Sequence, residues 1–405
     1  MIYQLYQAQS DLIEPIRTMA RIAAERLWQF RAGCFDDGVM RKLAAAYELV
    51  AQLGLTHHRP NYGIDAIEIA GEEIEITEEA VEVTPFCTLL RFRKAMAVEQ
   101  PRVLLVAPLS GHFATLLRDT VRTMLADHDV YITDWHNVRD VAMRHGRFGL
   151  DEYATLLIGF LERLGPDAHL VAVCQPSVPA LVAVAAMAQD GNPAQPRTMT
   201  LMAGPIDARV NPTEVDEFAT MRPIEWFEMN LIGIVPFRFA GAFRRVYPGF
   251  LQIAGFMTMN LDRHVKSFDD YYNHRAAGED DKAETIRRFY KEYFAVMDLP
   301  ATFYLETVAK IFQEHALARG TLCYRGTKVE PRAIRRTALF TVEGERDDIC
   351  AVGQTLAAHD LCTGLKPYMK RHYVQTGVGH YGVFAGKKWH SQIYPQLRDF
   401  IHDFA

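Results

Sequence analysis

A cysteine stands between an apolar run and a stretch of small residues, in the sequence V-C-Q-P-S. Residues 169–174 predict a strand and residues 177–189 a helix, so Cys174 falls at a sharp strand-to-helix turn. The positive end of a following helix favours the thiolate, which is the form of cysteine that attacks carbonyl groups. The pattern therefore predicts a cysteine nucleophile; a buried structural cysteine at a strand end is the alternative.

The usual motif at such a turn is G-x-S-x-G. Here Ala172 and Pro176 take the places of the two glycines, and Cys174 takes the place of the serine. The position of Cys174 in the predicted topology fits this motif better than the letters do. Ser177 is a competing nucleophile, but it lies three residues into the turn, where we expect it to cap or pack.

Two later loops could supply the partners of such a thiol. G-E-R-D-D-I follows a predicted strand and offers Asp347 and Asp348, and G-V-G-H-Y-G follows the last predicted strand and presents His380. The chain order of nucleophile, acid and histidine is that of α/β-hydrolases. His380 would take the thiol proton and then protonate the leaving alcohol, while the acid fixes the imidazole tautomer. A solvated acidic turn and a histidine without a catalytic role are the alternatives.

Acyl transfer also needs backbone N–H donors for the developing oxyanion. We assign this oxyanion hole to Gln175, directly after Cys174, and to Leu109 or Ser110 in the loop P-L-S-G-H. His112 in the same loop would lie near the hole, although a loop histidine that bonds to the backbone is the commoner role.

The elements that must position these residues alternate between strands and helices from residue 101 onward. Continuous apolar runs indicate strands buried on both faces, as in a parallel sheet. The predicted strands cover residues 102–108, 129–135, 169–174, 198–204, 337–345 and 369–376, and the predicted helices 113–126, 151–164, 177–189, 351–361 and 389–403. We therefore predict an α/β-hydrolase fold, with a mostly parallel central sheet, helices on both faces and a helical cap insertion.

The predicted division of the chain has four parts. Residues 1–100 form an N-terminal region, with helical periodicity over 11–55 and antiparallel strands over 64–94 that lead into the sheet. The first and second parts of the hydrolase core are residues 101–207 and 321–405.

Residues 208–320 between the two core parts are predicted to be the cap insertion. This segment is rich in aromatic side chains and methionines, and no strand is predicted in it. Trp226 and Phe227 are candidates for contact with an apolar substrate, while a plain core-forming cap explains the same residues equally well.

Composition limits the classes of function. The chain has 405 residues, of which 49% are hydrophobic and 23% charged, so it can bury a sizeable core. A net charge of -6 argues against a nucleic acid partner. The cysteines form no CxxC pair and no metal-ligand spacing, so we expect reduced thiols and no metal. They are Cys34, Cys87, Cys174, Cys323, Cys350 and Cys362.

The sequence also bears on location. The first residues lack the basic and apolar regions of a signal peptide. The run 170–188 could be mistaken for a membrane span, but two prolines and a glutamine near its start interrupt it. We therefore expect a cytoplasmic protein without a transmembrane segment.

Several long stretches of this sequence resemble the intracellular polyhydroxybutyrate depolymerases, and the resemblance covers nearly the whole chain. They include MIYQLYQAQSD, LSGHFATLLRDTV, YITDWHNVRDV, VCQPSVPALVAVAAMA, LMAGPIDARVNPTEV and GVGHYGVFAGKKW. The resemblance implies an α/β-hydrolase with its nucleophile at Cys174 in C-Q-P and its histidine at His380. It places the acid, in a G-x-x-D-x-I context, at Asp347 rather than Asp348. The implied substrate is native, amorphous polyester in storage granules.

We therefore expect a depolymerase that cleaves ester bonds of stored poly(3-hydroxybutyrate) at the granule surface. It would need no cofactor, although coenzyme A could replace water as the acyl acceptor. One alternative is an acyltransferase similar to polyhydroxyalkanoate synthases, which would use hydroxyacyl-coenzyme A; the missing glycines around Cys174 favour the depolymerase. Another alternative is a catalytically silent scaffold protein on the granule. No oligomeric state follows from the sequence.

Overall fold

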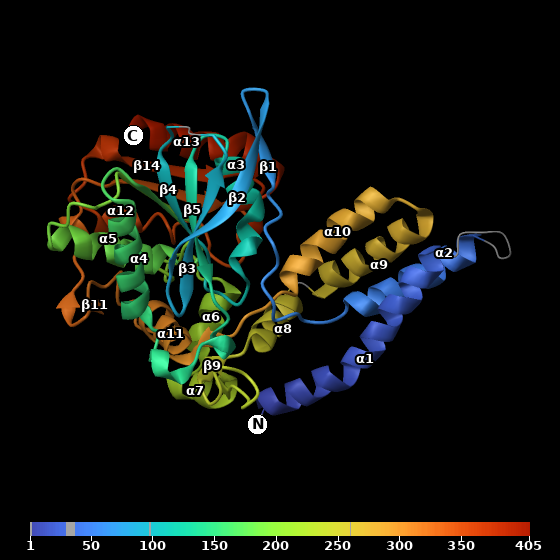
Figure 1. Cartoon of the computed structure of the whole chain (residues 1–405). Helices are drawn as coiled ribbons and strands as arrows, with labels where there is room; N and C mark the ends of the chain where they lie inside the picture. The colour runs from blue at the N-terminus through green and yellow to red at the C-terminus, as the bar shows by residue number, and fades with distance from the viewer. Residues whose placement is uncertain (1, 30–36, 97–98, 260) are drawn as a thin grey trace.

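A nine-stranded sheet runs through the body of the molecule in the computed structural model, which describes residues 2–29, 37–96, 99–259 and 261–405 (Figure 1). In spatial order the strands are β1 (Ala66–Ile69), β2 (Glu72–Val83), β3 (Cys87–Lys94), β5 (Asp129–Trp135), β4 (Arg102–Val106), β6 (His169–Val173), β7 (Thr198–Met202), β13 (Ala338–Gly344) and β14 (Lys370–Gln375). The six strands from β5 to β14 are parallel, and β1, β2 and β3 form an antiparallel edge. The predicted mostly parallel sheet is confirmed.

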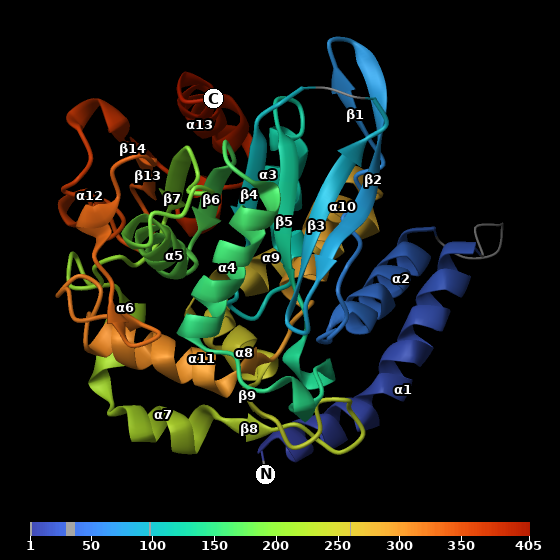
Figure 2. The same cartoon turned by 60° about the vertical axis from the view of Figure 1, so that its left-hand side comes forward.

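Helices cover both faces of this sheet. Helices α4 (Leu150–Leu164) and α5 (Ser177–Gln189) pack against each other on one face, and α3 (Arg118–Met124) and α13 (Tyr394–Asp403) lie together on the other (Figure 2). Because the sheet is covered twice, every residue of β6, β7 and β13 is buried. Continuous apolar runs have this consequence in parallel sheets.

The predicted helix at 351–361 differs from the structure, where only α12 (Ala358–Leu361) is helical. The residues before it form turns around the Glu343 carboxylate, which accepts hydrogen bonds from the amides of Gly353, Thr355 and Leu356 at 2.8–3.0 Å. A buried carboxylate that collects backbone amides replaces the helical hydrogen bonds here.

The segment between β7 and β13 is mainly helical. It contains α6 (Glu214–Met221), α7 (Ile224–Leu231), α8 (Gly249–Met259), α9 (Leu261–Ala277), α10 (Asp280–Tyr293) and α11 (Ala301–Glu306). In place of the predicted absence of strands, there is a small antiparallel sheet of β8 (Gly233–Ile234), β9 (Arg245–Tyr247) and β10 (Leu299–Pro300). Strands of two or three residues are too short to show a period in the sequence.

Two N-terminal helices, α1 (Ile2–Gln29) and α2 (Asp37–Gln52), precede the sheet. Helix α1 packs on α2, α2 on α9, and α9 on α10. These four helices, called the helical arm below, project from one side of the body (Figure 1). Within the described ranges, no helix is long and apolar enough to cross a membrane.

Candidate active site

Cys174 lies directly after β6 and three residues before α5 begins, in the turn predicted for it. Its φ angle is +68°, a left-handed conformation that side-chain-bearing residues rarely adopt. The Cys174 amide donates to the Met202 carbonyl at 2.7 Å, and its carbonyl accepts from the Ser177 amide at 3.0 Å. The turn is thus fixed to β7 and to the start of α5, and it holds a half-buried free thiol at the carboxyl edge of the sheet.

Room for this turn comes from Gly204, just beyond β7. A Cβ atom at Gly204 would stand 2.1 Å from the Ser177 hydroxyl oxygen and 2.8 Å from the Cys174 carbonyl oxygen. Ser177 itself is fully buried, and its hydroxyl has no hydrogen-bond partner among the described residues. The hydroxyl therefore fills the space beside Gly204 and is not presented at the edge of the sheet as a nucleophile.

Asp347 and His380, from the loops after β13 and β14, lie in direct contact. The Nδ1–H of His380 donates to Oδ2 of Asp347 at 2.8 Å. The other carboxylate oxygen, Oδ1, accepts from the amides of Ile349 and Cys350 at 2.9 and 2.8 Å. Asp347 is buried and held on both sides, whereas the neighbouring Asp348 is exposed and makes no hydrogen bond among the described residues.

The His380 imidazole is only 6% exposed. Burial by itself lowers the pKa of His380, but the negative charges of Asp347 and Cys174 and hydrogen bonds to both side chains raise that pKa well above its usual value. With Nδ1 engaged by Asp347, the Nε2 atom is left for the thiol. The structure therefore joins the predicted His380 and Asp347 side chains by a hydrogen bond, at the same edge of the sheet as Cys174.

The predicted oxyanion donors lie at the same edge of the sheet. Strand β4 pairs with β6, with Val106 opposite Ala172, so the loop after β4 adjoins the Cys174 turn. No acceptor among the described residues binds the backbone amides of Leu109, Ser110 or Gln175. All three amides are thus free to donate to a ligand.

Two hydrogen bonds with residues 293 and 297 fix the loop after β4. The Gly111 carbonyl (φ +93°) accepts from the Met297 amide at 2.8 Å, and the His112 ring donates from Nε2 to the Tyr293 carbonyl at 3.2 Å. Burial lowers the pKa of His112 to about 4, so this histidine is neutral near pH 7. His112 thus has the backbone-binding role that was expected as the commoner one.

Trp226 and Phe227 lie on α7 and belong to an aromatic cluster within the cap. Phe227 is 1% exposed, with its ring centroid 5.3 Å from Trp226 and 5.6 Å from Phe218. The described contacts do not join either side chain to Cys174, His380 or Asp347. The structure thus places this pair in a packing cluster of its own.

Two residues near the site escaped the sequence analysis. Glu343 is completely buried and shapes the turns behind Asp347. An acidic residue inside the apolar run ALFTVEG was the available signal. Tyr381 follows His380 and packs on the cap cluster that contains Tyr290 and Tyr293. Its position next to His380 was the only hint.

The sheet order, the strained turn at Cys174 and the acid and histidine loops after two later strands define an α/β-hydrolase. Residues 203–405, half of the chain, match the family model described as PHB de-polymerase C-terminus. The chain therefore belongs to this depolymerase family and is an ester-hydrolysing enzyme. The resemblance found in the sequence is confirmed.

No curated protein matches the chain in sequence. Solved structures with a similar outline include a meta-cleavage product hydrolase from Pseudomonas fluorescens IP01, 14% identical, which covers 84% of this chain and 97% of its own, with a TM-score of 0.42. An esterase from Thermogutta terrifontis is 13% identical over 84% of this chain and 97% of its own, also with a TM-score of 0.42. Such low TM-scores add nothing to the assignment of fold or family.

Proposed function

We propose that the chain is a polyhydroxybutyrate depolymerase that cleaves its substrate through a covalent acyl-enzyme on Cys174. The carrying observation is the buried hydrogen bond by which Asp347 holds His380, together with the raised pKa of His380, to which the nearby Cys174 contributes. The family match supports the polyester as substrate. The strained backbone at Cys174 supports a nucleophile, because such strain clusters at active sites.

Acylation begins with Cys174 and His380 as a thiolate–imidazolium pair. The sulfur attacks the ester carbonyl carbon, a C–S bond forms, and the carbonyl oxygen becomes an oxyanion. The amides of Gln175 and of Leu109 or Ser110 donate to this oxyanion. When the C–O bond to the alcohol breaks, the imidazolium gives its proton to the departing oxygen. The product of this step is a thioester on Cys174 and a free hydroxyl end.

Deacylation reverses the roles of the groups. Neutral His380 takes a proton from water, and the resulting hydroxide attacks the thioester carbonyl. The C–S bond breaks, so the acid product leaves and the thiolate–imidazolium pair returns. Asp347 keeps the proton on Nδ1 and stabilises the imidazolium throughout. Coenzyme A could replace water as the attacking group, which would release an acyl thioester.

The polymer would be met as an amorphous, water-insoluble granule. Exposed aromatic side chains of the cap insertion would contact it, because flat rings bury much area at low entropic cost. Among these, Phe237 is 85% exposed and Phe243 is 70% exposed. Trp226 is half-buried, so part of its side chain could take part in such contact.

The acyl-enzyme can be tested by stopping the enzyme in acid during turnover of amorphous granules and measuring its intact mass. We expect an added mass of whole hydroxybutyryl units, mapped to Cys174 and absent from Cys174→Ala. Incubation with hydroxyacyl-coenzyme A in place of granules serves as the control for synthase-like activity. Polymer growth from that thioester would favour the acyltransferase. A protein that never acquires an adduct and releases no product would contradict an enzymatic role.

A further inference from the structure

The end of β7 lies between the strand that precedes Cys174 and the strand that precedes the acid loop. In the sheet, β7 is the neighbour of both β6 and β13 (Figure 2). The Met202 carbonyl accepts from the Cys174 amide at 2.7 Å, and the Ala203 amide donates to the Val342 carbonyl at 2.8 Å. The end of β7 is therefore bonded to the turn at Cys174 on one side and to β13 on the other.

The backbone at this strand end is strained. The φ angle of Ala203 is +49°, in the left-handed region that side-chain-bearing residues rarely adopt. Such a conformation persists only where the surrounding contacts fix it. The next residue, Gly204, lies directly against Ser177 and the Cys174 carbonyl. The two peptides on either side of Gly204 therefore need a partner that fixes their orientation.

The side chain of Thr355 binds both of these peptides. Its hydroxyl oxygen accepts from the Gly204 amide at 2.8 Å, and its O–H donates to the Gly204 carbonyl at 3.0 Å. Thr355 is completely buried, so bulk water does not compete for either hydrogen bond. A hydroxyl group has one proton and two lone pairs. Gly204 takes the proton and one lone pair, which leaves one lone pair for another donor.

The same hydroxyl also contacts the acid loop. The Cys350 sulfur lies 3.8 Å from the Thr355 oxygen, so its S–H can donate to the remaining lone pair. The amide of Cys350 is one of the two that hold Asp347, at 2.8 Å. The Thr355 amide donates to the buried Glu343 carboxylate, also at 2.8 Å. One buried side chain thus connects the support of the Cys174 turn with the support of the acid.

Loss of this hydroxyl would have a local consequence. The Gly204 carbonyl would keep its hydrogen bond from the Ile206 amide at 2.9 Å, but the buried Gly204 amide would lose its partner. A buried amide without a partner is costly, so the peptide is expected to rotate. Because the Cys174 carbonyl lies beside Gly204, rotation would displace the turn and move the thiol relative to His380.

We propose that Thr355 is a positioning residue for ester cleavage: its hydroxyl fixes Gly204 against the Cys174 turn. Through this contact Thr355 sets where the thiol lies relative to the imidazole of His380. Thr355 acts through Gly204 and not on the substrate. The inference rests on the proposed function, in which Cys174 is the nucleophile. Displacement of a reacting group by about 1 Å can cost about 100-fold in rate.

Thr355→Val tests the proposal, because valine keeps the branched shape of threonine and removes the hydroxyl. With a short soluble ester, we expect kcat to fall about 10–100-fold and KM to change less than about twofold. Alkylation of Cys174 by iodoacetamide at pH 7 should slow about tenfold, because the imidazolium that favours the thiolate is farther away. The rate is followed on the peptide that contains Cys174. Exposed Cys323 should react equally in every variant and is the internal reference.

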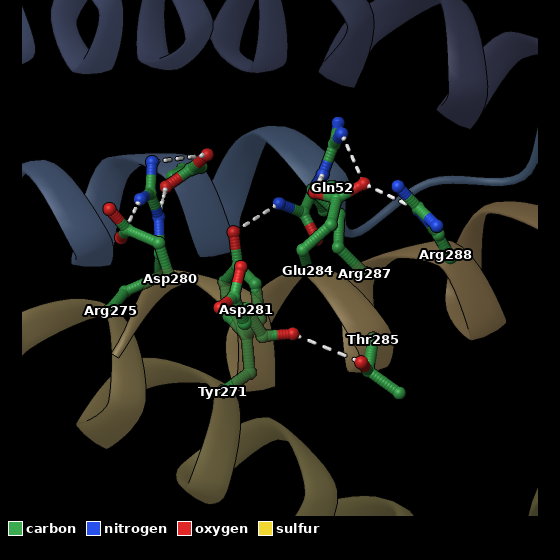
Figure 3. Close-up of polar contacts among 10 residues, drawn as sticks. Gln52, Tyr271, Arg275, Asp280, Asp281, Glu284, Thr285, Arg287 and Arg288 are labelled. Atoms are coloured by element: carbon green, nitrogen blue, oxygen red, sulfur yellow. Dashed lines mark hydrogen bonds and ion pairs between the residues drawn. The ribbon is translucent and has the colours of Figure 1, made fainter. Parts of the chain in front are cut away.

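Three further variants separate positioning from a general loss of stability. Thr355→Ser keeps the hydroxyl and should restore kcat and alkylation to within about threefold of the wild type. Thr200→Val is the matched control in β7, because the buried Thr200 hydroxyl has no hydrogen-bond partner among the described residues. Tyr271→Phe removes the hydrogen bond that Gln52 donates at 2.6 Å in the helical arm (Figure 3). Both controls should leave alkylation unchanged, even where the melting temperature falls.

Wild-type kcat and alkylation in folded Thr355→Val would overturn the proposal. Equal losses in Thr355→Ser would also overturn it, since they would assign the effect to the methyl group. The same holds for equal losses in Tyr271→Phe, which would assign the effect to stability. Circular dichroism checks that each variant is folded.

If Thr355→Val does not fold, Thr355→Cys takes its place, because a thiol forms weaker hydrogen bonds than the hydroxyl of Thr355→Ser. Equal values in those two variants would then overturn the proposal. Cys174→Ala, measured alongside, separates the two hypotheses. If it stays active, the nucleophile assignment fails and the role of Thr355 fails with it. If it is inactive while Thr355→Val is fully active, only the role of Thr355 fails.

Discussion

The central sheet and the helical arm treat apolar residues in opposite ways. In β6 and β7 every side chain is buried, because helices cover both faces of the sheet. In α1, by contrast, Leu12 is 76% exposed and Met19 70%. The same residue types form a core in one region and a surface in the other. What separates the two regions is the number of layers that this chain itself provides.

This difference has a functional counterpart. The body holds His380 against Asp347 by a hydrogen bond and gives Cys174 a strained backbone. The described helices of the arm have no non-glycine residue with a positive φ angle, and they offer a surface in place of a reactive group. Substitutions of these three side chains should therefore change chemistry while the fold persists, and substitutions in the arm should change stability or association while the chemistry persists.

The largest effect should come from Cys174→Ala, because no other described group stands at the strained turn. We expect kcat/KM for a short ester to fall by about 10⁴-fold or more, with the urea unfolding midpoint unchanged. Cys174→Ser should keep only a small fraction of activity, since a hydroxyl is less acidic and the site is shaped for sulfur. Activity near that of the wild type in the alanine variant would remove Cys174 from the mechanism.

Asp347→Asn should be the next most damaging change, with a loss of about 10³–10⁴-fold in kcat, because the imidazole would lose its tautomer control. Asp348→Asn is the matched control and should change kcat less than about twofold, since the exposed Asp348 makes no hydrogen bond among the described residues. Equal losses in the two variants would contradict the assignment of the acid.

The pH dependence of the rate in the variants Asp347→Asn and Asp348→Asn is a second test of which aspartate is the acid. Burial lowers the pKa of His380, because it disfavours the charged imidazolium. Among the effects that raise this pKa, the negative charge of Asp347 comes first. Because the pKa of His380 is raised in the folded protein, its ion pair with Asp347 contributes fully to stability below the pKa of an unfolded histidine, near 6.5. This contribution is lost as pH rises through the pKa of His380 in the folded protein. Asp347→Asn should therefore move the alkaline limb of the rate profile to lower pH, and Asp348→Asn should not.

A smaller effect is expected where the arm meets the body. The Tyr3 hydroxyl on α1 donates to the fully buried carboxylate of Asp298 at 2.5 Å. Tyr3→Phe would leave that oxygen without its donor, so the free energy of unfolding should fall by about 1–3 kcal/mol. Urea unfolding measures this loss. An unchanged midpoint would mean that α1 is held by its other contacts alone.

Asp298 also makes the stability of the contact between α1 and the body depend on pH. Burial raises the pKa of Asp298 to about 6, so the folded protein favours the protonated acid. The stability that this group contributes is complete below its unfolded value near 4 and is lost as pH rises toward about 6. Asp298→Asn should flatten the dependence of stability on pH across this window.

The smallest effect should be that of Phe237→Ala on polymer binding. A single exposed ring in the cap should account for less than about 1 kcal/mol, which is a change of a few-fold in granule affinity, with a soluble ester cleaved as before. Tyr368→Ala, at an aromatic side chain outside the cap that is 71% exposed, is the control. If folded alanine variants of the exposed aromatics across residues 226–272 all bind granules as the wild type does, the insertion acts only as a lid, and the polymer contact is to be sought in the first hundred residues.

Much of the fold could be predicted from the sequence, because continuous apolar runs leave few options other than buried parallel strands. The turns at 351–357 could not, since Glu343 organises them from a strand that lies ahead of them in the chain. The short strands β8, β9 and β10 were missed for a related reason. They exist through their partners and have no pattern of their own.

Part of the candidate site could likewise be predicted from the sequence, and part could not. Chain order and strand ends were enough to nominate Cys174 and His380, but two adjacent aspartates looked alike, and family resemblance chose Asp347. In the structure the two aspartates differ by burial and by hydrogen bonds from following amides. Trp226 and Phe227 were nominated on aromatic content alone, which does not distinguish a ring that packs inside a cap from one that meets a ligand.

Gly204 provides space at the Cys174 turn, which lacks the two glycines of the usual nucleophile motif. The Cys174 turn needs empty volume, and the neighbouring strand end supplies it: a methyl group at Gly204 would collide with Ser177 and with the Cys174 carbonyl. A sequence motif that covers only the residues around Cys174 does not include Gly204, so it cannot detect this space. In an engineering library, position 204 would behave as part of the nucleophile motif although it is 30 residues away.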